Sequence, residues 1–175
     1  GYSLGGRVCL HLALMYPHLA RRMVLIGANP GIDDADERAA RRLSDDAIAE
    51  RIQDIGVPAF IREWAGQPLF GTLALSDAEY ADRCRNTAEG LASSLTMAGT
   101  GAQGSLWPRL RELAMPILAL AGAEDLKFAA IAEQLAGATL DGTWQLIPGA
   151  AHAAHLQQPE AVMATIERWL PPLPA

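Results

Sequence analysis

The chain opens on Gly1-Tyr2-Ser3-Leu4-Gly5, and this Gly-x-Ser-x-Gly pattern restricts the fold more than any other feature of the sequence. A serine in this pattern sits on a sharp turn from a strand into a helix, and the flanking glycines leave room for the turn. The helix then points its N-terminus at Ser3, which makes the backbone N–H of Leu4 a donor to a developing oxyanion. No strand precedes Gly1, so we expect the chain to lack an N-terminal part of its fold.

Three short apolar runs, at residues 23–26, 116–121 and 144–147, each predict a buried parallel strand. A dense apolar stretch over residues 5–16 predicts a helix buried against the sheet. An amphipathic pattern over residues 161–170 predicts another helix, which follows the last strand. Strands that alternate with helices predict an α/β fold with a mostly parallel, doubly wound sheet.

The middle of the chain is helical in pattern and has no clear strand signal. Residues 33–43 predict one helix, Ser44 is expected to cap the next, and Ser76-Asp77-Ala78-Glu79 has the form of a capping box. A helical insertion after one strand of such a sheet predicts a lid over the strand ends where ligands bind. The sequence therefore predicts a core of residues 1–31 and 106–175, with a cap of residues 32–105.

A serine of ordinary pKa is a weak nucleophile, so the fold must supply a base and an orienting acid. Asp125 follows the second predicted strand and His152 follows the third, in the chain order Ser, Asp, His. Asp125 also suits a turn or a helix cap, and His152 suits a surface loop. His155, three residues further on, is an alternative base. Their joint placement favours Ser3, Asp125 and His152 as the nucleophile, acid and base.

The composition argues against several classes of binding partner and cofactor. The net charge of -6 argues against nucleic acid and anionic membrane surfaces, and no apolar run approaches the roughly 20 residues that span a bilayer. Cys9 and Cys84 fit neither a disulfide framework nor a metal site, which favours a reducing, cytoplasmic setting. The four histidines show no zinc-ligand spacing, and no nucleotide-binding glycine loop is present. We therefore expect no metal and no cofactor; the oligomeric state stays open.

Several stretches resemble the 2-succinyl-6-hydroxy-2,4-cyclohexadiene-1-carboxylate synthases of menaquinone biosynthesis, a subfamily of the α/β-hydrolase fold. The similarity covers essentially the whole chain, including the predicted cap. The stretches that carry it are Gly1–Arg7, Asn29–Gly31, Glu37–Arg41, Gln67–Phe70, Gly122–Phe128 and His152–His155.

This resemblance implies a lyase that eliminates pyruvate from a small polycarboxylate and uses the Ser–His pair to remove a ring proton. By resemblance, carboxylate binding falls to Arg7, Arg41 and Arg85, with Trp64 lining the pocket and Tyr2 beside the nucleophile. Structural alternatives remain for three of these residues. Arg41 follows Glu37 by four and Arg85 follows Asp82 by three, which suits surface ion pairs, and Trp64 suits the core of the cap.

Two departures bear on the resemblance. Ala151 stands before His152 where the family has glycine, and the loop that supplies the second oxyanion donor is absent from this sequence. Two other functions stay open: a serine hydrolase of esters, thioesters or carbon–carbon bonds, and a non-catalytic binding module. The strand at residues 23–26 is expected to have an unpaired edge, which predicts aggregation or inactivity of the isolated chain.

Overall fold

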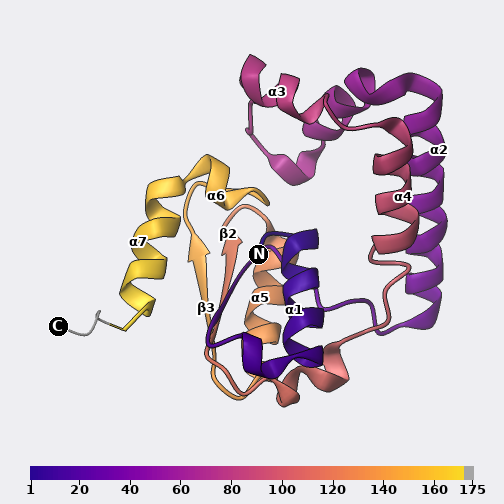
Figure 1. Ribbon diagram of the computed structural model, residues 1–175. Coiled ribbons are helices and arrows are strands. Elements are labelled where there is room, and N and C mark those ends of the chain that lie inside the picture. Colours follow the sequence, from indigo (N-terminus) through magenta and orange to yellow (C-terminus); the bar gives the residue numbers. More distant parts are fainter. Residues whose placement is uncertain (172–175) are drawn as a thin grey trace. The chain divides into compact units, whose positions relative to one another are not determined.

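The computed structural model describes residues 1–171, which form two compact units. The first unit contains Gly1–Pro30 and the chain from Leu106 onward, and the second contains Gly31–Ser105. Figure 1 shows the strands in the first unit, whereas the second is built from helices. No helix in the described part of the chain is both long enough and apolar enough to cross a membrane.

The sheet of the first unit confirms the α/β prediction. Strands β1 (Met23–Ile26), β2 (Ile117–Gly122) and β3 (Gly142–Ile147) are parallel and lie in the order β1-β2-β3. β2 is buried throughout, as its apolar sequence predicts. The expectation that the third strand is fully buried is wrong: β3 lies at an edge of this sheet and is buried only at its last residue, Ile147.

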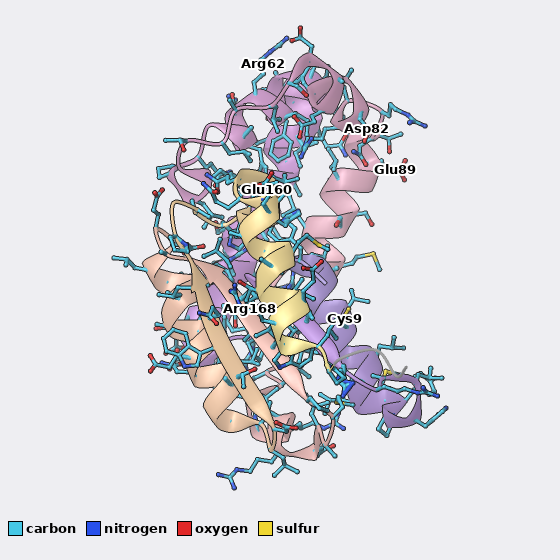
Figure 2. The ribbon with its side chains drawn as sticks, turned by 90° about the vertical axis from the view of Figure 1, so that its left-hand side faces the viewer. Cys9, Arg62, Asp82, Glu89, Glu160 and Arg168 are labelled. Carbon is cyan, nitrogen blue, oxygen red and sulfur yellow. The ribbon has the colours of Figure 1, made fainter. Side chains whose placement is uncertain are left out.

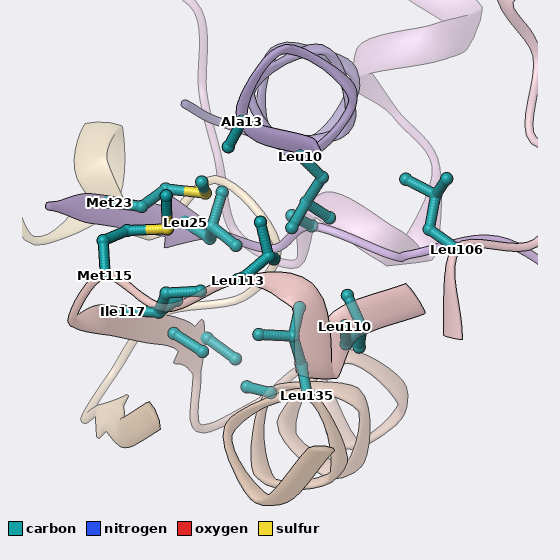
Figure 3. Packing of buried hydrophobic residues seen from close by; sticks show 14 residues of the cluster. Leu10, Ala13, Met23, Leu25, Leu106, Leu110, Leu113, Met115, Ile117 and Leu135 are labelled. Carbon is teal, nitrogen blue, oxygen red and sulfur yellow. The ribbon is translucent and has the colours of Figure 1, made fainter. Parts of the chain in front are cut away.

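Alternate residues of β1 and β2 belong to two separate apolar clusters, one on each face of the sheet. One face carries Leu25, Ile117 and Ala119, which pack with residues of helices α1 (Leu4–Met15) and α5 (Leu126–Ala138) (Figure 3). The other face carries Leu118 and Leu120, which pack with α7 (Pro159–Trp169). Coverage of the sheet on both faces explains why β1 and β2 are continuously apolar rather than alternating.

The far edge of β1 is not left unpaired, contrary to the expectation from sequence. Tyr2 forms a parallel bridge with Ile26, the amide of Ile26 donates to the carbonyl of Gly1 at 2.9 Å, and the amide of Ser3 donates to Ile26 at 2.9 Å. The first three residues therefore occupy the position of a neighbouring strand. This pairing places Ser3 beside the carboxyl end of β1.

The described part of the first unit also contains three short helices besides α1, α5 and α7. These are η1 (Pro17–Leu19), η3 (Trp107–Glu112) and α6 (Ala154–Gln157). The dense apolar pattern of α1 overstated its burial, because only Gly6, Arg7, Leu10 and Ala13 are buried, while other apolar side chains such as Val8 are exposed. α7 has Glu160 in its first turn and Arg168 in its last, which suits the helix dipole (Figure 2).

The second unit consists of α2 (Ala35–Ala65), η2 (Pro68–Phe70), α3 (Asp77–Arg83) and α4 (Ala88–Ala98). The predicted capping box is confirmed: Ser76 and Glu79 bond reciprocally at the start of α3. The predicted break at Ser44 is wrong, because α2 continues through it. The helix is interrupted instead at Gly56, whose φ of 76° is not helical.

Replacing Leu135 by Ala should destabilise the protein by about 2–5 kcal/mol, because its side chain fills the cluster between α5 and the sheet. Leu126→Ala on the same helix is the matched control, since Leu126 has an exposed fraction of 79% and Leu135 one of 1%. The control should cost no more than about 0.5 kcal/mol. Urea unfolding measures both, and equal losses would contradict the packing of α5.

Candidate active site

Ser3 lies on a strained turn between the edge of the sheet and α1. Its φ of 46° makes it the only non-glycine residue with positive φ among residues 1–171. Such backbone conformations cost about 1–3 kcal/mol and are held by the surrounding structure. A Cβ at Gly1 would lie 2.6 Å from the carbonyl oxygen of Gly5, and one at Gly6 would lie 2.6 Å from Cβ of Ala28. The tight approaches are therefore at Gly1 and Gly6, whereas Gly5 faces open space.

The structure brings Ser3, His152 and Asp125 together as one hydrogen-bonded chain. His152 Nε2 lies 3.1 Å from Ser3 Oγ, and His152 Nδ1 lies 2.9 Å from Asp125 Oδ2. The side chains of His152 and Asp125 are both buried. A buried carboxylate at Nδ1 fixes the imidazole tautomer that leaves Nε2 able to accept a proton from the hydroxyl. The arrangement can activate the serine or move a proton at a bound substrate.

Asp125 has a second role as the N-cap of α5. Its Oδ1 accepts a hydrogen bond from the backbone N–H of Phe128 at 3.2 Å, while Oδ2 is engaged by His152. Asp125 thus caps α5 through Oδ1, as one interpretation of the sequence predicted, and contacts His152 through Oδ2, as the other predicted. The cap fixes the carboxylate in the orientation that His152 requires.

The loop that carries His152 packs against the end of β2. A Cβ on Gly122 would overlap the main-chain carbonyls of Ala150 and Ala151. The amide of Ala151 donates to Gln157 Oε1 at 2.8 Å. Ala151 does not have positive φ, so its position makes no demand for the glycine that the related family has there.

Aromatic rings and one glycine surround the imidazole of His152. The ring of Phe128 lies 4.3 Å from it between centroids, and the ring of Tyr2 lies 5.3 Å from it. A Cβ at Gly27, whose φ is 55°, would lie 2.9 Å from His152 Cε1. Sequence reasoning missed Phe128 and Gly27; the signals were a glycine directly after an apolar strand and an aromatic residue in the first turn after Asp125.

Other predicted residues of the first unit also lie near Ser3. The ring of His155 lies 4.3 Å from that of Tyr2 and is tilted against it by 51°, while the imidazole within hydrogen-bond distance of Ser3 is that of His152. Leu4 is the first residue of α1, at the end where helix N–H groups are not used within the helix. Arg7 is buried one turn into α1, as expected, and its amide donates to the carbonyl of Ser3 at 3.1 Å.

The three predicted residues of the second unit have partners there. Arg41 bonds Asp45 at 2.8 Å, so the ion pair that it forms is not the one with Glu37 that the structural alternative named. Arg85 bonds Asp82 at 3.2 Å on the surface, as the ion-pair alternative predicted. Trp64 packs in the apolar cluster of this unit, with its ring 5.5 Å from that of Phe60.

Gly27→Ala should slow covalent labelling of Ser3 by a fluorophosphonate roughly 100-fold, because the added methyl displaces the imidazole that activates the serine. Gly56→Ala is the control, since its φ of 76° and ψ of 165° also strain alanine, while no atom lies within 4 Å of the new Cβ. The control should label close to the wild-type rate. Comparable slowing in both variants would show that backbone strain, not contact with His152, causes the loss.

Comparison with known proteins places this geometry in a family. The sequence matches the alpha/beta hydrolase family over residues 1–165. It is 35% identical to a putative 2-succinyl-6-hydroxy-2,4-cyclohexadiene-1-carboxylate synthase of Bacillus subtilis, over 97% of this chain and 64% of the relative. It is 37% identical to the synthase of that name from Klebsiella pneumoniae, over 97% of this chain and 66% of the relative. The chain thus spans just under two thirds of the length of these relatives.

Solved structures agree with this placement. The structure of MenH from S. aureus superimposes with a TM-score of 0.90 at 34% identity, over 97% of this chain and 66% of that one. A thermophilic esterase from Thermogutta terrifontis gives a TM-score of 0.76 at 25% identity, over 97% and 62%. The resemblance inferred from the sequence motifs is confirmed, and the chain belongs to the alpha/beta hydrolase family.

Proposed function

We propose that the protein is a carbon–oxygen lyase that eliminates pyruvate from 2-succinyl-5-enolpyruvyl-6-hydroxy-3-cyclohexene-1-carboxylate. The product is 2-succinyl-6-hydroxy-2,4-cyclohexadiene-1-carboxylate. The observation that carries the proposal is the similarity to synthases of this name over 97% of the chain, through both of its units. A hydrogen-bonded Ser3, His152 and Asp125 supports it, because the proposed reaction needs a base in the site.

The chemistry assigned to these residues is a proton abstraction followed by loss of a leaving group. The Ser3–His152 pair removes the ring proton at C2, and the electron pair left behind forms the C2–C3 double bond. The existing C3–C4 double bond shifts to C4–C5, and the bond from C5 to the enolpyruvyl oxygen breaks. The departing enolate takes up a proton and becomes pyruvate. Asp125 stabilises the imidazolium of His152 while it holds the proton. The backbone N–H of Leu4 is positioned by α1 to donate to negative charge that develops during the step.

Positive charge for the substrate carboxylates is assigned to Arg7, Arg41 and Arg85. In a chain of net charge -6, arginines in a binding site serve to offset the repulsion of an anionic substrate. Arg7 has the best structural support, because a buried cation one turn after the nucleophile does little for packing. Tyr2 beside His152, and Trp64, are assigned to the apolar ring of the substrate.

A serine hydrolase of esters, thioesters or carbon–carbon bonds is the second candidate. The same three side chains support hydrolysis with water as the second nucleophile, and the similarity to an esterase favours this alternative. A non-catalytic binding module has less support, because it gives no reason to hold a serine at positive φ against a buried imidazole. The proposed ligand is a small polycarboxylate, and the proposed location of the protein is the cytoplasm. The proposal involves no nucleic acid, membrane, metal or cofactor.

The deciding assay compares pyruvate release from the enolpyruvyl substrate with hydrolysis of a short p-nitrophenyl ester. It uses the longest natural polypeptide that contains this chain. We expect pyruvate release, and a fall of about 100-fold to 10,000-fold in Ser3→Ala, the range that general acid–base assistance contributes. Brisk ester hydrolysis without pyruvate release would establish the hydrolase and refute the lyase.

Arg7→Ala should raise KM for the polycarboxylate about tenfold or more, because a charge-assisted hydrogen bond to a substrate carboxylate is lost. Arg21→Ala, which removes an exposed arginine of the same unit, is the control and should leave KM unchanged. Thermal unfolding of both variants separates a binding effect from a folding defect. A normal KM in a folded Arg7→Ala variant would remove Arg7 from the site.

A further inference from the structure

Asp45 interrupts the buried face of α2. Ala49 and Ile52, four and seven positions further along, share this face with it and are apolar. α2 packs against α4, and the two helices lie side by side (Figure 1). An apolar residue would suit position 45, yet the residue there is an aspartate whose exposed fraction as a whole is 1%. Helix packing therefore does not explain the choice of Asp.

The carboxylate is fitted tightly against the end of α4. A Cβ on Gly99, which follows α4, would overlap Asp45 Oδ2. Within the part of the chain that the structure describes, Oδ2 has no hydrogen-bond partner. A buried carboxylate oxygen without a donor lowers stability, so this residue needs a reason beyond the fold of the second unit.

Asp45 engages Arg41 through a single guanidinium nitrogen, as Asp82 engages Arg85 on the surface. Asp45 Oδ1 accepts from Arg41 Nε at 2.8 Å. Two exposed arginines on the same chain engage their carboxylates through two nitrogens each: Arg51 bonds Glu63 through Nε and Nη2, and Arg109 bonds Glu112 in the same way. Asp45 holds Arg41 through Nε alone, because its second oxygen is turned toward Gly99.

This geometry leaves the outer edge of the Arg41 guanidinium open. The two terminal nitrogens carry four of the five N–H donors, and their parallel pair matches the two oxygens of a carboxylate. The Arg41 side chain has an exposed fraction of 39% and that of Asp45 one of 2%, so the contact fixes the guanidinium from its buried side. A guanidinium fixed at Nε loses less freedom when it binds an anion.

We propose that Asp45 is a positioning residue that orients Arg41 for two-point binding of a substrate carboxylate. The inference rests on the proposed function for the role of Arg41, and it identifies the ligand group as a planar carboxylate rather than a general negative charge. Asp45 itself does not touch the ligand. Its effect on binding is therefore expected to pass entirely through Arg41.

The test measures the dissociation constant of 2-succinylbenzoate, a stable dicarboxylate, by calorimetry in the longest natural polypeptide that contains the chain. Asp45→Ala and Arg41→Ala should each weaken binding about tenfold, the loss expected for one charge-assisted contact. The double variant should bind no more weakly than Arg41→Ala alone, because residues that act through one another are not additive. Glu63→Ala, which releases Arg51 on the same helix, should leave the dissociation constant unchanged.

A purely structural role for Asp45 gives a different pattern. Asp45→Ala would then weaken binding equally with and without Arg41, or would lower the melting temperature and leave binding intact; either result overturns the inference. If Asp45→Ala does not fold, Asp45→Asn has the same size and a weaker, uncharged acceptor. It should lose about threefold in affinity, again only when Arg41 is present.

Pyruvate release is followed in the same variants, which separates this inference from the proposed reaction. Dicarboxylate binding that depends on Arg41 and Asp45, without pyruvate release, would support the positioning role and refute the lyase. Pyruvate release with unchanged dicarboxylate binding in Asp45→Ala would support the lyase and refute the positioning role of Asp45. A wild-type protein that does not bind the dicarboxylate also overturns the inference.

Discussion

The candidate site depends on one backbone contact, where the end of β2 meets the loop after β3. Main-chain bonds from Ala123 to Ile147 and from Glu124 to Ala150, each 2.9 Å, tie the two segments together. Only glycine fits at position 122, because any side chain would overlap the carbonyls of that loop. Asp125 follows one segment and His152 follows the other, so this contact sets the distance between them. The orientation of the His152 imidazole is thus fixed by backbone contacts at the end of the sheet as well as by its side-chain hydrogen bonds.

Much of the first unit could be predicted from local sequence. Apolar runs of four to six residues indicated the strands, and the order of Ser3, Asp125 and His152 at strand ends indicated the triad. The exposure of β3 could not be predicted, because the same short apolar segment suits a buried central strand and an exposed edge strand. The pairing of β1 with the first three residues was missed, since a single bridge has no periodicity to detect.

The second unit was less predictable because its helices are specified by contacts with one another. Glu37 and Asp45 are each four residues from Arg41, and the sequence alone does not tell which of them pairs with it. The packing of α2 on α4 decides, because it buries Asp45 and leaves Glu37 at the surface. α2 continues through the exposed Ser44, because serine is only mildly unfavourable inside a helix and its tendency to begin one is weak. In the first unit, an aromatic residue in the first turn after Asp125 was the signal for Phe128, but its contact with His152 follows only from the folded sheet.

Ser3 is held in a backbone conformation that glycine adopts at little cost and serine does not. A sequence under selection for stability alone would relax toward glycine at this position, since the hydroxyl contributes little to the packing of the turn. Serine at position 3 therefore fits a site that uses its hydroxyl oxygen, as the proposed function requires. A descendant that kept the fold only as a scaffold would be expected to lose this serine early, and the exchange would make its elbow more stable.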